Sequence, residues 1–258
     1  MSTHNRGKKI KRAIESILNQ SLKDFEFIIC DDHSDDDTLN IIKRYSEIDS
    51  RIKIIINKKN IGLQKSLNKC IKESSGEYIA RMDDDDYSCS NRLEKELEYM
   101  KLSGADFVGS NIDFFSNELG VYGQKVYPEK PTKIDLIKSC VFCHPSILIK
   151  SSIIKKYGGY SESKKHLRVE DYELWLRLYK NGCVGQNIQE PLLVYTKDIN
   201  SIKNIRWVDR IHAFNLLNEY FHDFKLSYGY YLFIVYPLIK FLIPTRMRTL
   251  INYIKYKK

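Results

Sequence analysis

The chain has 258 residues, of which 43% are apolar and 29% charged, and its formal net charge is +9. This length and composition suit one large α/β domain, or a domain with an appendage, and exclude a largely disordered chain. The basic balance suits nucleic acid, an anionic membrane surface or a phosphate-bearing substrate, and does not choose among them.

Apolar periodicity predicts alternating helices and strands through the first half of the chain. Residues 8–19 and 38–45 have helical spacing, whereas 25–30 is a short apolar run typical of a buried strand and 52–56 is again a predicted strand. A helix beginning near Leu63 and ending before Gly76, a strand over 77–81, a helix over 92–103 and a strand after Gly104 continue the alternation. This order predicts an α/β fold with a mostly parallel sheet covered by helices on both faces.

The alternation weakens after about residue 115, although residues 168–181 have clear helical spacing. We expect one domain over residues 1–200 and a helical, basic C-terminal extension over 201–258. Residues 228–244 are apolar but contain Pro237 and Lys240, so they fall short of the ~20 clean apolar residues of a membrane span. Two interpretations stay open: a segment that lies at a membrane interface, or a helix that covers the domain's own core.

One cysteine pattern matches the C-x-x-C-H string of haem attachment, over residues 140–144. Such attachment occurs outside the cytoplasm and needs an export signal, which the sequence does not show. We therefore expect a strand with two packed thiols here, and a reducing compartment for the protein.

Two acidic clusters follow predicted strands: Asp31 with Asp32, and the run from Asp83 to Asp86. In α/β sheets, ligands bind beyond the carboxyl ends of the strands. Adjacent carboxylates raise one another's pKa unless a cation neutralises them, and Mg²⁺ takes one or two carboxylates together with substrate phosphates. The clusters predict a clamp for a metal-bound diphosphate; the alternative for each is a solvated acidic turn.

A third acidic pair, Glu170 and Asp171, begins the predicted helix at 168–181. Acids in a first turn interact favourably with the helix dipole, which is one explanation. The other is a general base that takes a proton from an attacking hydroxyl.

Five segments together resemble the family 2 inverting glycosyltransferases of the GT-A (Rossmann-like) fold. They are STHN, CDDHSDDDT, NKKNIGLQKSLN, GEYIARMDDDDYSCSNRLEKEL and VEDYELWLRL, in that order over about residues 1–200. Relatives begin with a strand of the form V-S-V-I-M-P-T-Y-N. From this we expect that about five residues of a first strand are missing before Met1 and that their loss costs several kcal/mol of stability.

The resemblance implies roles for individual residues. It places Asp32 on the nucleotide base, Asp83 at the ribose and Asp85 on the metal, with Asp83 and Asp86 as further metal ligands. It makes Asp171 the catalytic base, with Glu170 beside it. The remaining contacts to the nucleotide-sugar are assigned to Thr3, His4, Asn60, Gly62 and His144.

The implied reaction is transfer of a sugar, with inversion, from a nucleotide diphosphate donor such as a UDP-sugar, assisted by Mg²⁺ or Mn²⁺. We expect a saccharide or lipid-linked acceptor, a role in cell-surface polysaccharide synthesis and no nucleic-acid partner. We expect a cytoplasmic location, including the inner face of the plasma membrane as a peripheral protein. The alternatives are a degenerate donor-binding scaffold and a nucleotidyltransferase, although STHNRGKK lacks the glycine-rich loop expected of the latter.

Overall fold

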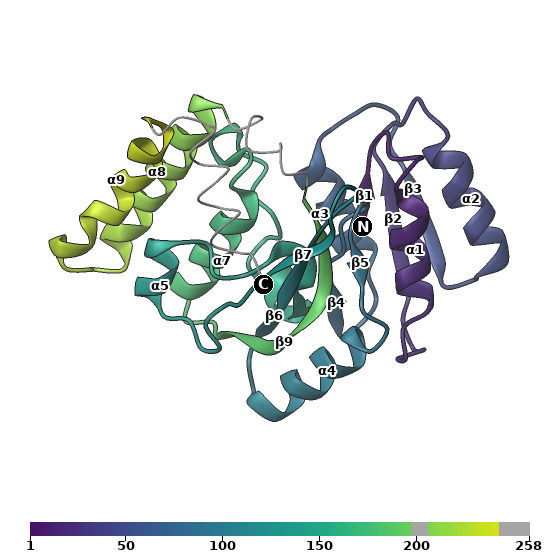
Figure 1. Cartoon of the computed structure of the whole chain (residues 1–258), viewed down its shortest axis with the longest axis horizontal. Coiled ribbons are helices and arrows are strands. Elements are labelled where there is room, and N and C mark those ends of the chain that lie inside the picture. Colours follow the sequence, from purple (N-terminus) through teal and green to yellow (C-terminus); the bar gives the residue numbers. More distant parts are fainter. Residues whose placement is uncertain (198–205, 243–258) are drawn as a thin grey trace.

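The computed structural model describes residues 1–197 and 206–242, which form two sheets with helices around them (Figure 1). The first sheet is parallel, in the order β1 (Ser2–Thr3), β2 (Phe27–Asp31) and β3 (Ile52–Ile56). Every residue of β2 is buried, as the uninterrupted apolar run FIIC requires. This sheet carries the first acidic cluster at its carboxyl edge.

The second sheet is mixed, in the order β4-β8-β6-β9-β5, with β7 paired to β6. Its strands are β4 (Tyr78–Ala80), β5 (Tyr87–Ser88), β6 (Phe107–Ser116), β7 (Gly120–Lys125), β8 (Leu148–Lys150) and β9 (Gly185–Thr196). Only β6 and β9 pair in parallel; the other pairs in this sheet are antiparallel. The α/β class with helices around the sheet is confirmed, but the expectation of mostly parallel pairing is wrong for this second sheet.

The helices follow the predicted apolar stripes closely. In α1 (Ile10–Leu18) the buried positions include Ile10, Ala13, Ile14 and Ile17, at the spacing of one helix face. Helix α4 (Arg92–Ser103) ends at Gly104, whose φ of 69° is left-handed. The other helices are α2 (Thr38–Ile48), α3 (Leu63–Glu73), α5 (Lys133–Lys138), α6 (Ser151–Lys156), α7 (Glu170–Lys180), α8 (Trp207–Asp223) and α9 (Tyr231–Leu242).

The segment that matches C-x-x-C-H is not the expected strand. It is irregular chain after α5, and it ends in the 3-10 turn η1 (His144–Ser146). Asn187 holds it by donating a hydrogen bond to the carbonyl of Val141 at 3.1 Å, while Phe142 packs 5.7 Å from Trp175, centroid to centroid. A side-chain amide thus takes the place of a strand partner.

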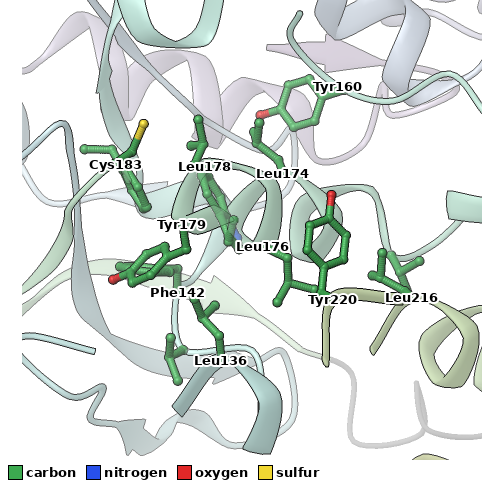
Figure 2. Close-up of a cluster of buried hydrophobic side chains, with 14 of the residues drawn as sticks. Leu136, Phe142, Tyr160, Leu174, Leu176, Leu178, Tyr179, Cys183, Leu216 and Tyr220 are labelled. Carbon is green, nitrogen blue, oxygen red and sulfur yellow. The ribbon is translucent and has the colours of Figure 1, made fainter. Parts of the chain in front are cut away.

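The larger core lies around α7 (Figure 2). Trp175 is fully buried and stacks on Phe107 of β6, with ring centroids 5.2 Å apart. Leu216 and Tyr220 of α8 pack into the same cluster. Because burying one such side chain contributes about 1.5–3 kcal/mol, α8 belongs energetically to the main core. The expected division between residues 1–200 and 201–258 remains a prediction, and residues 198–205 and 243–258 lie outside the described part.

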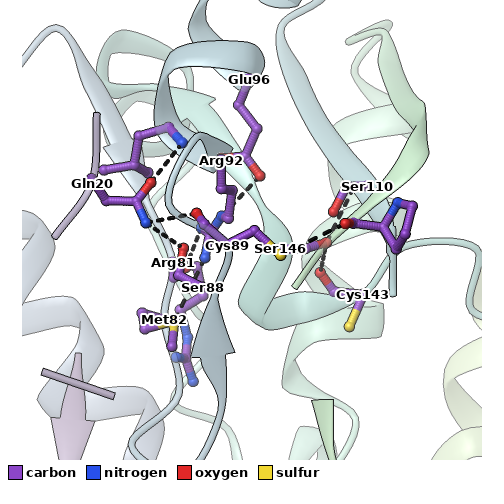
Figure 3. A network of polar contacts seen from close by, with 12 residues as sticks. Gln20, Arg81, Met82, Ser88, Cys89, Arg92, Glu96, Ser110, Cys143 and Ser146 are labelled. Atoms are coloured by element: carbon purple, nitrogen blue, oxygen red, sulfur yellow. Dashed lines mark hydrogen bonds and ion pairs between the residues drawn. The ribbon is translucent and has the colours of Figure 1, made fainter. Parts of the chain in front are cut away.

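A buried polar network fixes the second acidic cluster in place (Figure 3). Arg92, fully buried, donates to the carbonyl of Arg81 at 2.7 Å and to Glu96 Oε1 at 2.9 Å. Gln20 Nε2 donates to Ser88 Oγ at 3.1 Å and to the carbonyl of Cys89 at 2.8 Å. The chain is therefore held on both sides of Asp83–Asp86, which gives the four carboxylates a rigid base.

A cavity of 660 Å³ separates the two sheets. Phe27 and Ile28 of β2 line one side and β4 lines the other, while β1 pairs with β2 only opposite Cys30 and Asp31. In this region the edges of the two sheets face each other, and no strand from residues 1–197 or 206–242 pairs with Phe27 or Ile28 on this side.

Candidate active site

Asp32 anchors the loop between β3 and α3. Its Oδ1 accepts hydrogen bonds from Asn57 Nδ2 at 2.8 Å and from the N–H of Ile61 at 2.9 Å, and its Oδ2 accepts from the N–H of Gly62 at 2.8 Å. Burial alone would raise the pKa of Asp32, but these donors, with Ser66, hold it below its ordinary value. Asp32 is thus an ionised carboxylate at the carboxyl end of β2. Its Oδ2 accepts one hydrogen bond and can accept another.

Gly62 and Asn60 belong to this loop. Gly62 has a φ of 90°, a backbone conformation that other residues adopt only with strain, and α3 begins directly after it. Asn60 is exposed at the loop surface. The loop therefore lies beside Asp32, as a nucleotide-binding segment requires.

Thr3 and His4 follow β1 at the same edge. Thr3 is buried and pairs with Asp31 across the sheet. His4 Nδ1 and Asp31 Oδ1 are buried without a hydrogen-bond partner among residues 1–197 and 206–242. Buried polar atoms without partners are costly, so these two are available to a polar ligand.

The four aspartates of the acidic run have different environments. Asp83 pairs with Arg81, Asp84 lies 3.3 Å from Arg6 Nε, and Asp85 lies 3.8 Å from Lys9 Nζ. Asp86 Oδ1 accepts a 2.7 Å bond from the N–H of Thr196, whereas its Oδ2 is buried and finds no partner within the described chain.

Burial and mutual repulsion govern the charges of the run. Burial and the charge of Asp83 raise the pKa of Asp85, and the same two causes raise that of Asp86 well above its ordinary value. Asp83 is the exception: burial opposes its charge, but the charge of Arg81 and its hydrogen bond lower the pKa of Asp83 on balance. Carboxylates that are costly to ionise together fit a site that a divalent cation would neutralise.

The donor set fits a hard cation that receives only a few protein ligands. Asp85 keeps a partly exposed carboxylate and Asp86 an unpartnered oxygen, whereas Asp83 is engaged by Arg81. No group of three His, Cys, Asp or Glu side chains able to enclose a metal occurs among the residues described. Mg²⁺ in such a site completes its shell with phosphate oxygens and water.

Arg81 lies among the acidic groups of the site. It is not one of the site residues that the sequence predicts. Its side chain is buried, and its Nε and Nη1 have no hydrogen-bond partner in the parts of the chain that the structure describes. Burial and the charge of Arg81 together lower the pKa of His144 to about 3, so the imidazole is neutral, and its Nε2 lies 2.6 Å from Tyr160 Oη. The sequence signal that could have identified Arg81 is its position at the end of a predicted strand, just before the run Asp83–Asp86.

Asp171 and Glu170 begin α7 and face the same region. Burial and then the charge of Asp83 raise the pKa of Asp171, while the N–H of Tyr172 and the charge of Arg81 oppose the rise. Glu170 Oε2 accepts a 3.4 Å bond from Gln64 on α3, and burial raises its pKa as well. The structure thus brings Asp83, Asp171 and His144 around Arg81, with the Asp32 loop joined to them through Gln64.

Comparisons with known proteins show the family of this chain. Residues 1–158 match the family described as "Glycosyl transferase family 2". The chain belongs to glycosyltransferase family 2. It is 37% identical over 246 residues to "Putative glycosyltransferase EpsE" of Bacillus subtilis (strain 168), and the match covers 95% of this chain and 88% of that protein. It is 30% identical over 185 residues, 72% of this chain and 70% of the other, to the Escherichia coli "UDP-Glc:alpha-D-GlcNAc-diphosphoundecaprenol beta-1,3-glucosyltransferase WfgD".

Solved structures confirm the GT-A fold of this family 2 enzyme. Staphylococcus aureus TarS in complex with UDP-GlcNAc aligns with a TM-score of 0.66 at 20% identity, covering 88% of this chain and 72% of that one. The mannosyltransferase PcManGT of Pyrobaculum calidifontis, in complex with GDP-Man and Mn²⁺, aligns with a TM-score of 0.61 at 16% identity, covering 88% and 63%. The chain is thus a nucleotide-sugar glycosyltransferase, as expected, while the roles of its individual residues remain predictions.

Proposed function

We propose that this enzyme transfers a sugar from a UDP-sugar to an acceptor hydroxyl by direct displacement, with Asp171 as the general base. The observation that carries the proposal is the position of Asp171. It is a partly buried carboxylate, with a raised pKa, at the start of α7, and it interacts electrostatically with Asp83 and Arg81. A base near its substrate's hydroxyl works best when its pKa is closer to the operating pH than that of a free aspartate.

In the proposed donor site, the uracil lies against Asp32 and the loop containing Asn60 and Gly62, with Thr3 and His4 on its other side. Asp83 lies at the ribose. The Nε and Nη1 atoms of Arg81 lack partners among the described residues, which supports contact with the diphosphate, because guanidinium N–H groups form charge-assisted hydrogen bonds to phosphate oxygens. His144, which is neutral, donates a hydrogen bond to the nucleotide-sugar without adding positive charge to the site.

The metal site of the proposal consists of Asp85, with Asp83 and Asp86 as further carboxylates. A bound Mg²⁺ or Mn²⁺ supplies stabilisation for the negative charge of the departing diphosphate. Asp85 is favoured as the main metal ligand, because Asp83 is already paired with Arg81 and one oxygen of Asp86 accepts a hydrogen bond from Thr196.

The chemical step balances without other groups. Asp171 takes the proton of the acceptor hydroxyl, whose oxygen forms a bond to the anomeric carbon from the face opposite the leaving group. The bond from that carbon to the diphosphate oxygen breaks with its electron pair, and the nucleoside diphosphate leaves. Configuration at the anomeric carbon inverts, and Glu170 stays beside the base.

We further propose a saccharide or lipid-linked acceptor, which the printed name of WfgD supports, and a role in cell-surface polysaccharide synthesis, which the name of the Escherichia coli relative "O-antigen biosynthesis glycosyltransferase WbnJ" supports. No helix within the described residues is long and apolar enough to cross a bilayer. The exposed apolar side chains of α9, among them Leu232 and Tyr236, support peripheral contact with the inner face of a membrane.

Release of UDP from UDP-glucose or UDP-GlcNAc tests the role of Asp171. Asp171→Asn should lower kcat by about 10²–10⁴-fold and leave the Kd for UDP unchanged, because the variant loses a proton acceptor but keeps the donor contacts. Glu170→Gln is the matched control and should retain most activity. Equal rates for Asp171→Asn and the wild type would refute the assignment, and no turnover by the wild type, with UDP bound, would favour the scaffold alternative.

A further inference from the structure

A second cavity, of 310 Å³, opens beside the proposed base. Helices α5, α7, α8 and α9 surround it, at the end of the molecule away from β1–β3 (Figure 1). Asp171 lies in its wall, so the cavity reaches the proposed site of reaction. Its other chemically informative lining residues are Lys138, Arg168, Arg210, Phe233 and Tyr236.

The wall carries more positive than negative side chains. Lys138, Arg168 and Arg210 line the cavity, against Asp171 and Asp209. Arg168 Nε lies 3.4 Å from Asp209, which also receives Arg206 at 3.2 Å. Lys138 makes no salt bridge among the described residues, and its ammonium lies 5.8 Å from the ring centroid of Phe233. The wall of the cavity therefore carries a positive charge, on Lys138, together with the proposed catalytic base, Asp171.

The mouth continues into an apolar surface on α9. Leu232, Tyr236 and Ile239 are 75%, 48% and 49% exposed and recur at the spacing of one helix face. Phe233, 38% exposed, joins this stripe to the cavity wall. Ile234, at 0% exposure, faces the core instead, so the helix is anchored by one face and presents the other outward. We call these four exposed residues the α9 stripe.

We propose that the cavity and the α9 stripe bind an acceptor in which a phosphate group joins the sugar to a long hydrocarbon chain. The phosphate lies at Lys138 and Arg168, the chain follows the α9 stripe, and the sugar hydroxyl reaches Asp171. This inference rests on the proposed role of Asp171. It goes further by assigning a phosphate site and a lipid site to named residues.

The geometry favours one lipid-linked molecule over a general anionic membrane surface. A concave pocket that contains two carboxylates and three cations suits a single head group, whereas a flat bilayer contacts only its rim. Lys138 lies against Phe233 of the α9 stripe, and Arg168 precedes Asp171 by three residues in the same wall, so one acceptor can meet the base, the cations and the stripe together. Anionic lipids of a bilayer could bind the cations at the surface, and this binding would not require a cavity.

Vesicle flotation tests the proposal without requiring turnover. The probes are phosphatidylcholine vesicles, the same vesicles with phosphatidylglycerol, and the same vesicles with GlcNAc-diphosphoundecaprenol at equal surface charge. We expect the third set to bind at least about fivefold more protein than the second. Equal binding to the second and third sets would overturn the proposal in favour of bulk membrane attachment, and so would no binding to either.

Matched variants locate the binding. Leu232→Asp should reduce binding to the acceptor vesicles about tenfold, whereas Leu102→Asp, at an equally apolar and exposed position on α4, should have no effect. Lys138→Ala should remove the preference for the diphosphate lipid, with Lys101→Ala on α4 as its control. Tyr236→Ser repeats the test if Leu232→Asp unfolds. Loss of binding in the α4 controls as well would refute the assignment.

The donor site is measured separately by calorimetry with UDP and Mn²⁺. Donor binding that persists while the acceptor preference is absent would overturn only this acceptor site. Loss of both would instead count against the proposed function itself.

Discussion

Replacing Asp32 with Asn tests whether this carboxylate organises the donor loop. The wild-type oxygens accept three hydrogen bonds, from Asn57 Nδ2, Ile61 N–H and Gly62 N–H, at 2.8–2.9 Å. An Asn side chain of the same shape keeps one oxygen and places an NH₂ group where Oδ2 was. That group faces the N–H of Gly62, so a donor meets a donor.

The expected loss follows from two contributions. One charge-assisted hydrogen bond is worth about 1.5–3 kcal/mol, and a buried donor left without a partner costs about 1–3 kcal/mol. Allowing for relaxation of the loop, we expect Asp32→Asn to lower the free energy of unfolding by about 3 kcal/mol. For a protein of this size that corresponds to a Tm lower by roughly 6–12 °C.

Thermal and urea unfolding measure this change, with Asp35→Asn as the control because Asp35 is an exposed member of the same segment. Asp32 has a folded-state pKa below its ordinary 3.8, so its contribution is present above that pH and is lost as pH falls through the folded-state pKa. The difference between the wild type and Asp32→Asn should therefore narrow on acidification below about pH 4. A loss no larger than that of Asp35→Asn, or a difference independent of pH, would refute the reasoning.

Three further outcomes are expected. Burial raises the pKa of Asp171, so kcat should fall with decreasing pH through a pKa above 3.8, and a pH–rate profile with its inflection at or below 3.8 would contradict this. Gly62→Ala should destabilise by about 1–3 kcal/mol in thermal unfolding because its φ is 90°, whereas Gly229→Ala, with no positive φ, should not. An N-terminal Val-Ser-Val-Ile-Val extension should raise the Tm by about 5–10 °C by filling the 660 Å³ cavity, and a Gly-Ser extension of equal length should not; equal effects would argue against a strand in that space.

Local pattern predicted most elements of the first half well. The helix over 92–103 and the strand over 52–56 have the expected bounds, because a charged amphipathic stripe ending at Gly104 and an isoleucine-rich run broken only by Lys53 are strong local signals. The pairing of the second sheet was not predictable from such signals. Strands of two or three residues, such as β4 and β5, carry too little periodicity to show direction, and their partners are 68 or more residues away in sequence.

The candidate site was predicted in its acidic parts and missed in its basic part. Strand-end position identified Asp32 and the run from Asp83, since both follow apolar strands. Arg81 was overlooked because an arginine at the end of EYIAR resembles a surface residue until Arg92 and the neighbouring helix are seen to bury it. Its importance depends on contacts between distant segments, which periodicity does not encode.

The C-terminal region shows the same limit. Hydropathy alone left an interfacial helix and a core-covering helix as alternatives for residues 228–244. In the structure α8 packs into the main core, and α9 has one face on that core and the α9 stripe exposed. The core-covering interpretation therefore holds for the buried face of α9, where Ile234 joins the main core, whereas contact of its exposed face with a membrane remains a proposal.

The most direct test of the account is calorimetric titration with UDP, with and without Mn²⁺, of the wild type, Asp85→Ala and Asp171→Asn. The account predicts binding by the wild type that requires Mn²⁺, loss of that binding in Asp85→Ala, and unchanged binding in Asp171→Asn. Binding of UDP that is independent of the metal and unaffected by Asp85→Ala would contradict the proposed metal–diphosphate site.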